Sequence, residues 1–431
     1  MTISFSDIQK TFNERKDNPL YNTSYPLDPV DWERYRVNTP LPFNPDEILS
    51  FYIHIPFCPQ ICSFCEYTRM YRPSVEIQNR YITTLKKDID DFIQKYPTIT
   101  LNGFDIGGGT PTVLEFSEFS HLMEVYENVI KKVKLTNDFE PSIEGTFSTL
   151  TTDNLNKIAD VGIKRISLGI QSTDLHVMSH SHRKNVDLDL IKEKIDNAYR
   201  AGIKKINLDF MYGLKFQTIA TLKKDLEMIE LLLPEQITLY ELRTNRIKEE
   251  SHTNDIQRFE MYSFLYEELI KMGYQAYFGQ NTFSLNKDDL GVSSYLRHRM
   301  REGSSYKGFG LSAQSMSKSG LSYNIGKDNN KLKDKLSGLS YKEEFTYNLP
   351  PIEIASKYIA ISAYSGAFSI SKLTEILQED SELVFQQPLR FCIDNDLMQQ
   401  TGDFIRITKK GFKHYGAVFS LFYYRETKFK S

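Results

Sequence analysis

Segments that read as strands alternate with segments that read as helices between about residue 50 and residue 280. The helical segments carry apolar residues three or four positions apart, as Tyr81, Leu85 and Ile89 do within residues 75–95. Strand–helix alternation of this kind predicts a parallel sheet with covering helices. Because the unit recurs about six times, we expect an α/β fold built as a partial (β/α)6 TIM-like barrel, not an open sheet.

The predicted barrel elements can be placed by residue number. Strands are expected at 50–55, 103–106, 142–145, 165–170, 205–210, 236–240 and 274–278, and helices at 75–95, 116–132, 152–161, 188–201, 219–232 and 258–272. Gly162 and Gly202 each stand just past a helix, where a left-handed residue is wanted. In a barrel of this type, ligands collect at the carboxyl ends of the strands.

The alternation of strand and helix segments ends after about residue 330. Helical segments at 352–365, 371–379 and 383–394 precede a hairpin that turns at Thr401-Gly402, an order that predicts a small winged-helix-like domain. We therefore divide the chain into an N-terminal arm (1–49), the barrel with its extension (50–327) and a C-terminal helical, winged-helix-like domain (328–431). The proline-rich arm is expected to wrap the barrel without much regular structure.

Composition limits the classes of partner. The net charge is −3 and 25% of residues are charged, so neither a nucleic-acid nor a membrane-surface bias is present. No apolar run approaches the roughly 20 residues needed to span a bilayer. The first residues lack the basic and apolar regions of a secretory signal. We therefore expect a cytoplasmic, reduced globular protein that binds no nucleic acid and no membrane.

Three of the four cysteines form a C-x-x-x-C-x-x-C run at Cys58, Cys62 and Cys65. A disulfide would leave one of these thiols unpaired. Three thiolates can hold three corners of a [4Fe–4S] cluster and leave one iron open. Two alternatives stay open from spacing alone, namely a zinc site completed by His54 and unligated thiols. The fourth cysteine, Cys392, is expected to be a small buried hydrophobe.

An open iron can chelate the amino and carboxylate groups of S-adenosylmethionine (SAM), whose reductive cleavage releases a 5′-deoxyadenosyl radical. Phe64 precedes the last cysteine and could pack on adenine, although ordinary core packing explains it as well. The run Gly107-Gly-Gly-Thr-Pro111 follows a predicted strand. Its glycines allow close backbone approach to a ligand, and a plain strand-to-helix turn is the alternative.

Polar residues stand at or just beyond the ends of several predicted strands. Glu144 and Asp209 end apolar strands, where a carboxylate could bind ribose hydroxyls or an ammonium group. Gln171 follows another strand, and Arg183 lies in a loop where it could pair with a carboxylate. Each could be a structural polar residue. As a series on one barrel face they predict a site.

The run 52–58 (YIHIPFC) and the stretches 107–112, 166–172, 207–213 and 308–313 together resemble the radical SAM superfamily, and more closely its oxygen-independent coproporphyrinogen III oxidase-like family. The resemblance implies that Cys58, Cys62 and Cys65 ligate the cluster and that there are two SAM sites. Residues at the first site would be Tyr52, Gly108 and Glu144. Those at the second would be Phe64, Gly109, Thr110, Gln171, Arg183 and Asp209. No catalytic residue is identified.

The chain departs from the authentic oxidase at several positions. The oxidase has a further cysteine two positions after the last ligand, where this chain has Tyr67. The run 66–71 resembles the C-methyltransferase and cyclopropanase members of the family, and the run 240–245 points the same way. Gln314 stands where the oxidase has an apolar residue.

Three functions follow as hypotheses. The first is a radical enzyme that uses a second SAM to methylate or cyclopropanate a small molecule or peptide. The second is tetrapyrrole chemistry, either coproporphyrinogen decarboxylation or reductive haem opening. The third is a haem chaperone without turnover. The resemblance also implies an electron donor of the flavodoxin or ferredoxin type.

Overall fold

The computed structural model describes residues 5–16, 25–26, 29–184, 187–242, 255–326, 336 and 340–423. Its central feature is a run of parallel strands that pair side by side. In spatial order these strands are β12 (Ser305–Phe309), β2 (Ile48–Ile55), β5 (Thr100–Gly108), β7 (Pro141–Gly145), β8 (Arg165–Gln171), β9 (Lys205–Tyr212) and β10 (Gln236–Glu241). The six strands from β2 to β10 match the six predicted between residues 50 and 240.

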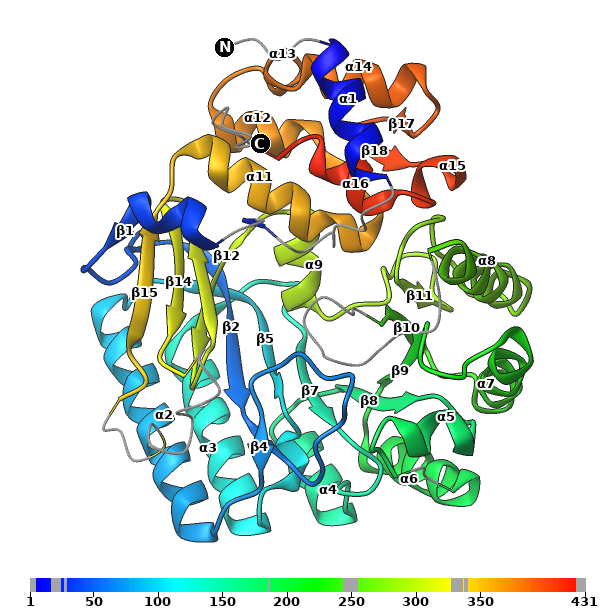
Figure 1. The fold of residues 1–431 in the computed structure, drawn as a ribbon. Coiled ribbons are helices and arrows are strands. Elements are labelled where there is room, and N and C mark those ends of the chain that lie inside the picture. The colour runs from blue at the N-terminus through cyan, green and yellow to red at the C-terminus, as the bar shows by residue number, and fades with distance from the viewer. Residues whose placement is uncertain are drawn as a thin grey trace.

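Helices cover the outer face of this sheet (Figure 1). They are α2 (Val75–Lys95), α3 (Phe116–Lys132), α4 (Thr152–Asp160), α6 (Leu188–Ala201), α7 (Ile219–Leu232) and α8 (Asp255–Lys271). Gly162 and Gly202 have φ values of 86° and 105°, which confirms the predicted left-handed residues after two of these helices. The α/β architecture with a central parallel sheet is therefore as the sequence predicted.

The sheet continues past the parallel strands on both sides. Beyond β12 it adds the antiparallel strands β13 (Gln314–Ser317), β14 (Gly320–Asn324), β15 (Glu343–Asn348) and β1 (Arg36–Val37). On the opposite side β11 (Thr282–Ser284) pairs antiparallel with β10. Within the described residues β11 and β1 end the sheet and do not pair with each other, so the barrel is open.

The predicted strand at 274–278 is wrong. In that segment Gln275 forms one antiparallel bridge to Ser284, and the chain then turns at Gly279, which has a φ of 86°. A Cβ atom on Gly279 would lie 2.6 Å from Cγ2 of Ile407. Close packing against this distant segment ends the extended run, which the local pattern does not reveal.

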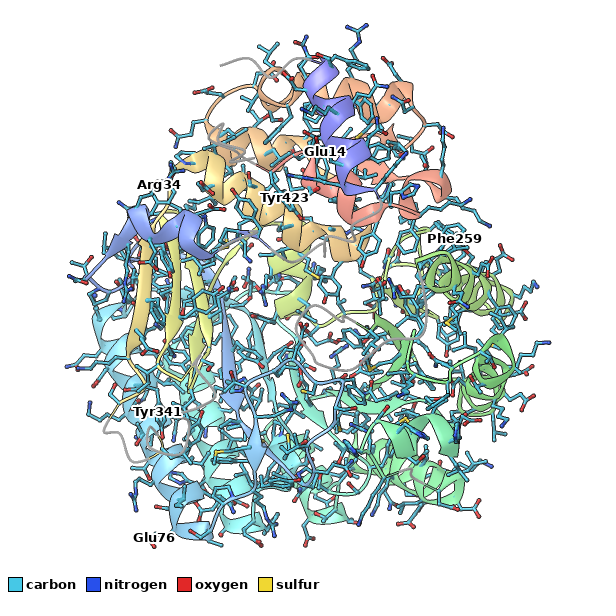
Figure 2. The ribbon with its side chains drawn as sticks, in the orientation of Figure 1. Glu14, Arg34, Glu76, Phe259, Tyr341 and Tyr423 are labelled. Carbon is cyan, nitrogen blue, oxygen red and sulfur yellow. The ribbon has the colours of Figure 1, made fainter. Side chains whose placement is uncertain are left out.

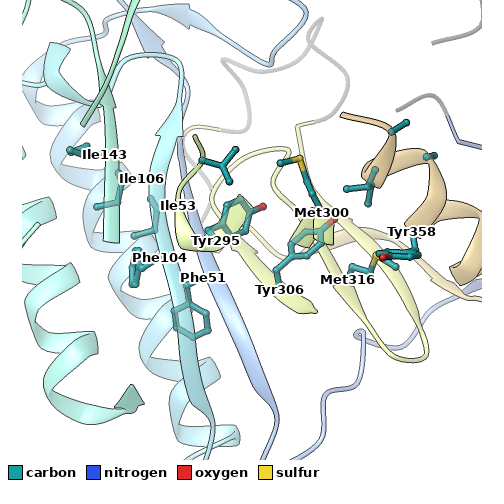
Figure 3. Close-up of a cluster of buried hydrophobic side chains, with 14 of the residues drawn as sticks. Phe51, Ile53, Phe104, Ile106, Ile143, Tyr295, Met300, Tyr306, Met316 and Tyr358 are labelled. Carbon is teal, nitrogen blue, oxygen red and sulfur yellow. The ribbon is translucent and has the colours of Figure 1, made fainter. Parts of the chain in front are cut away.

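The core of the barrel is built from the alternate residues of neighbouring strands. Phe51 and Ile53 of β2 lie beside Phe104 and Ile106 of β5 (Figure 3), and all four are fully buried. The rings of Phe51 and Phe104 meet edge to face with centroids 5.9 Å apart. Burial of side chains of this size contributes about 1.5–3 kcal/mol each, which holds the strand ends in fixed register.

The C-terminal unit follows the predicted order of helices and then a hairpin. It contains α11 (Pro351–Ser362), η4 (Ala363–Ser365), β16 (Ala367–Ser369), α12 (Ile370–Leu377), α13 (Ser381–Val384), α14 (Gln386–Asp394), β17 (Met398–Thr401), β18 (Phe404–Ile407), α15 (Lys409–Phe412) and α16 (Tyr415–Ser420). The three strands form a small antiparallel sheet in the order β16-β18-β17. Cys392 is fully buried in this unit, as predicted. The boundary placed between residues 327 and 328 lies outside the described residues.

The N-terminal arm is more regular than predicted. Residues Phe5–Arg15 form the helix α1, and η1 (Pro29–Tyr35) leads into β1. The rings of Phe5 and Phe12 lie 5.6 and 5.5 Å from that of Phe391, so α1 packs on the C-terminal unit (Figure 1). Tyr25 likewise packs on Tyr423, which Figure 2 labels. The helix forms because its apolar residues find this face of a segment nearly 400 positions away in sequence.

No helix among the described residues is both long enough and apolar enough to cross a lipid bilayer.

Candidate functional site

A cavity opens at the carboxyl ends of β5, β7, β8, β9 and β10, below the loop that follows β2. About 1160 Å³ lies between its walls, part of it open to solvent. All the residues predicted to bind the cluster or SAM line this cavity except Tyr52. They are Cys58, Cys62, Phe64, Cys65, Gly108, Gly109, Thr110, Glu144, Gln171, Arg183 and Asp209. The topology therefore brings together residues spread over about 150 positions of the chain.

The cysteine loop is closed at its base by backbone hydrogen bonds. Strands β3 (Phe57–Cys58) and β4 (Met70–Tyr71) pair, and the N–H of Arg72 donates to the carbonyl of Cys58 at 3.0 Å. Inside the loop, Nη2 of Arg69 donates to the carbonyl of Cys62 at 3.1 Å. The N–H of Ser63 donates to the carbonyl of Ser181 at 3.1 Å, which ties the loop to the end of α5 (Leu175–His180). The loop is thus held to the barrel from two sides.

The three cysteines of this loop are free thiols that face one cavity. Burial raises the pKa of Cys58 to about 12, so this sulfur becomes a thiolate only beside a strong positive charge. The described part of the chain contains no group of three His, Cys, Asp or Glu side chains close enough to hold a single metal ion. Three thiols that face one cavity are a donor set that could hold three corners of a [4Fe–4S] cluster.

His54, the alternative zinc ligand, is occupied elsewhere. One ring nitrogen, Nε2, lies 2.9 Å from the carbonyl oxygen of Thr68. A Cβ atom on Gly108 would overlap the other side of the ring. Burial lowers the pKa of His54 to about 4, so the ring is neutral and helps support the cysteine loop from beneath.

The three glycines at the end of β5, Gly107 to Gly109, form a cradle that has no room for side chains. A Cβ atom on Gly109 would lie 2.6 Å from the carbonyl oxygen of Phe57 and 3.0 Å from the sulfur of Cys58. One on Gly107 would lie 2.5 Å from Oε1 of Glu144. Gly108 has a φ of 111°, which only glycine adopts without strain. The glycines therefore allow the end of β5 to pack directly against the cysteine loop and Glu144.

Two half-buried carboxyl groups point into the cavity from the ends of β7 and β9. Glu144 accepts a hydrogen bond from the N–H of Gly108 at 3.0 Å, and Asp209 accepts from Asn207 at 2.7 Å and Ser167 at 3.1 Å. Burial raises the pKa of Glu144 to about 7 and that of Asp209 to about 6. No described cation lies within ion-pair distance of either group. A cationic ligand would meet both charges at once.

Gln171 and Arg183 form a second polar edge. Gln171 ends β8 with a φ of 74°, a left-handed conformation that turns the backbone at the strand end. Arg183 donates from Nη2 to the carbonyl of Gly169 at 2.6 Å, and its Nη1 lies 3.8 Å from the sulfur of Cys62. The guanidinium thus bridges the β8 end and the cysteine loop, where it can also meet an anionic group.

Tyr52 is the one predicted residue that does not line the cavity. Its ring stacks on that of Tyr295, with centroids 5.6 Å apart and planes 20° apart. Its assignment to a SAM site stays a prediction that rests on the resemblance.

Other lining residues were not predicted as ligands, and they include Gln60, Arg69, Thr146, Ser167, Met211, Glu241 and Tyr364. Ser167 and Met211 each lie close to a predicted ligand on the same or the neighbouring strand face, so strand alternation alone could have found them. Tyr364 comes from the C-terminal unit, and no local signal could have placed it here.

Comparison with known proteins agrees with this geometry. Residues 52–229 match the model of the radical SAM superfamily. The oxygen-independent coproporphyrinogen III oxidase of Helicobacter pylori (strain J99) is 31% identical over 243 residues, which cover 54% of this chain and 52% of that protein. The heme chaperone HemW of Lactococcus lactis is 26% identical over 390 residues, which cover 86% of this chain and 97% of that protein. The chain thus spans about half the length of the Helicobacter pylori oxidase.

Among solved structures, coproporphyrinogen III oxidase (HemN) from Escherichia coli superposes with a TM-score of 0.72. The alignment covers 88% of this chain and 91% of that chain at 21% sequence identity. At this identity the match concerns the fold, and it extends across the barrel and into the C-terminal unit.

Proposed function

Because the chain belongs to the radical SAM superfamily and to its oxygen-independent coproporphyrinogen III oxidase-like family, we propose that it is an enzyme that holds two molecules of SAM in this one cavity. Proteins of this superfamily use a [4Fe–4S] cluster and SAM. In our proposal the second molecule donates a methyl or methylene carbon to a small molecule or peptide. We assign the second molecule to the second set of polar and aromatic residues beside the cysteine loop.

Cys58, Cys62 and Cys65 would hold the cluster, and Gly108 with Glu144 would hold the first SAM. When bound, the reduced cluster supplies the electron that cleaves a carbon–sulfur bond of SAM. The chain's own contribution is to place and shield the reactants. The glycine cradle brings backbone close to the ligand, and the closed cysteine loop covers the cavity.

The second SAM would lie between β8, β9 and the cysteine loop. Arg183 presents a planar fork of donors suited to a carboxylate, and Asp209 presents a half-buried acceptor suited to a hydroxyl or ammonium group. Phe64 offers an apolar surface to the adenine, while Gly109 and Thr110 leave the backbone open to the ligand. Gln171 completes this edge.

The charge of the lining is the observation that carries the proposal. The described residues contribute the carboxyl groups of Glu66, Glu144, Asp209 and Glu241, against the guanidinium groups of Arg69 and Arg183. Glu241 is paired with Arg258 at 2.9 Å outside the lining set, but Glu144 and Asp209 have no such ion pair with a described residue. Positively charged sulfonium and ammonium groups suit this surface better than a substrate with several carboxylates.

The test is anaerobic incubation of the reduced, cluster-loaded enzyme with methyl-deuterated SAM and candidate substrates. We expect a product whose mass increases by a labelled methyl or methylene group, together with 5′-deoxyadenosine. Formation of 5′-deoxyadenosine beside a product that carries no label would contradict carbon transfer while leaving radical SAM activity intact.

Tetrapyrrole chemistry is the second candidate, because the relatives are named as a coproporphyrinogen III oxidase and a heme chaperone. To test this candidate, the reduced, cluster-loaded enzyme is incubated with SAM and either coproporphyrinogen III or haem. Decarboxylated or ring-opened products would favour this candidate over carbon transfer. Stoichiometric haem binding without SAM cleavage would favour a chaperone. In each enzymatic case a reductant of the flavodoxin or ferredoxin type is the proposed electron donor.

A further inference from the structure

Two arginines meet where the barrel joins the C-terminal unit, away from the cavity described above. Arg301 ends α9 (Ser294–Arg301), and Arg406 lies in β18. The Cζ atoms of Arg301 and Arg406 stand 5.0 and 5.1 Å from the centre of the same ring, that of Phe404. Arg406 also stacks over Tyr277, at 3.7 Å from its ring centre. Three segments distant in sequence therefore place two positive charges around one ring.

Neither guanidinium has a hydrogen-bond partner or a counter-charge among the described residues. Nε and Nη2 of Arg301 and Nε and Nη1 of Arg406 are buried and donate to no acceptor. No described carboxylate lies within ion-pair distance of either side chain, although Arg406 is only 7% exposed. By contrast, the buried Arg165 donates to Gln236 at 2.8 Å and to Ser142 at 2.7 Å.

Two largely buried positive charges without a counter-charge among the described residues lower the stability of the folded protein. Burial lowers the pKa of both guanidinium groups, and the charge of Arg406 lowers that of Arg301 further. Both nevertheless stay charged near neutral pH, because an arginine side chain is not deprotonated in proteins. A buried charge without a partner is strongly destabilising, and two of like sign are worse. An anion supplied from outside the chain would relieve both costs.

The frame around the pair is tightly packed. Tyr358, labelled in Figure 3, donates from its hydroxyl to the carbonyl of Arg301 at 2.9 Å. A Cβ atom on Gly366 would lie 3.0 Å from the backbone of Gly279, which holds the Tyr277 turn against the β16–β18 sheet. Tyr277, whose ring stacks on Arg406, is itself 53% exposed, so this ring separates the pair from solvent.

We propose that Arg301 and Arg406 bind a phosphate dianion, either inorganic phosphate or the phosphate group of a small phosphorylated molecule. Each guanidinium is a planar fork of donors suited to phosphate oxygens, and two positive charges match the two negative charges of the dianion. A single carboxylate would neutralise only half of the pair. The site is separate from the SAM cavity and holds the barrel and the C-terminal unit together when occupied.

The test measures phosphate binding to the cluster-loaded full chain by calorimetry at constant ionic strength. We expect one phosphate per chain and a rise in the unfolding temperature that chloride or acetate does not produce. Arg301→Gln and Arg406→Gln should each weaken binding at least about tenfold, since hydrogen bonds to a charged group are lost. Arg390→Gln is the matched control, because Arg390 is exposed and bonded to Asp394. Binding that matches chloride, or that survives both variants, overturns the proposal.

Two further arms complete the test. Methyl phosphate is compared with inorganic phosphate: equal affinity assigns the site to the phosphate group alone, and tighter binding of the ester assigns it to a phosphorylated molecule. The stability of the phosphate-free variants separates a ligand site from a structural role. We expect Arg301→Gln and Arg406→Gln to unfold at the wild-type temperature or above it, because each removes an unpaired charge. Lower stability or failure to fold would mean that the arginines are structural, and would refute the site.

Discussion

Gly109→Ala is the sharpest test of the glycine cradle, because it adds one methyl group where two chain segments meet the cysteine loop. The new Cβ atom would lie 2.6 Å from the carbonyl oxygen of Phe57 and 2.8 Å from that of Ile55. Ordinary carbon–oxygen contacts begin near roughly 3.3 Å, so the segments must separate by roughly 0.7 Å. Gly109 does not have a left-handed φ, so the effect is steric and not a matter of backbone preference.

Moving these two segments apart weakens two backbone hydrogen bonds. The N–H of Gly109 donates to the carbonyl of Ile55 at 2.8 Å, and the N–H of Thr110 donates to the carbonyl of Phe57 at 2.7 Å. Overpacking of this kind destabilises a protein by about 1–3 kcal/mol. Because Cys58 directly follows Phe57, its sulfur moves with the displaced carbonyl. We therefore expect the iron bound per chain to fall to roughly half of the wild-type value or less, since cluster binding depends on ligand placement.

The assay is anaerobic cluster reconstitution followed by measurement of iron, sulfide and the EPR signal of the reduced cluster. Gly162→Ala is the control: its φ is 86° and no atom lies within 4 Å of the added methyl, so it strains the backbone without a clash. Wild-type iron content in Gly109→Ala, or an equal loss in Gly162→Ala, would refute the reasoning.

Three more outcomes are expected. In ligand-free protein the stability contributed by Glu144 is present below its ordinary pKa of 4.5 and is lost as the pH rises through its folded pKa of about 7. Between about pH 5 and 8 the free energy of unfolding in urea should therefore fall less for Glu144→Gln than for the wild type. An identical fall in the two proteins would contradict the raised pKa. Arg183→Lys should reduce SAM bound in equilibrium dialysis from two per chain to one, because an ammonium lacks the planar fork; two molecules at unchanged affinity would exclude a role for Arg183. Phe391→Ala should lower the free energy of unfolding by about 3–5 kcal/mol and expose α1 to limited proteolysis, and unaltered protection would argue against docking of α1 through this ring.

The local pattern of apolar and polar residues was enough to predict a helix or strand where that element is stabilised by its own residues. The bounds of α2, α3, α6 and α7 coincide with the predicted helices, because each has an apolar face that packs on the sheet, and α6 and α7 also begin at a side-chain N-cap. The predicted strands also showed where each strand ends. Because parallel strands bring their carboxyl ends to one edge, the position of the cavity could be predicted from them. All but one of the residues predicted to bind the cluster or SAM therefore line one cavity, and their roles as ligands stay predictions that rest on the resemblance.

Long-range packing decided the remainder. The extended run at 274–278 is broken by contact between Gly279 and Ile407, and α1 is regular because Phe391 completes its apolar face. Tyr364 reaches the cavity only because the C-terminal unit lies across the barrel mouth. None of these contacts leaves a periodic signal in the segments that make them.

The sequence by itself determined the chemistry available to this protein: three thiols at cluster spacing, a glycine run, and polar groups at the ends of the parallel strands. Those features are local, so spacing and residue type reveal them. Only the tertiary structure decided which groups are desolvated and which charges find partners. It raised the pKa of Glu144 and Asp209 by burial, turned Tyr52 onto Tyr295, and set Arg301 beside Arg406 without a counter-charge among the described residues. Burial and charge pairing depend on neighbours far away along the chain, which no short stretch of sequence contains.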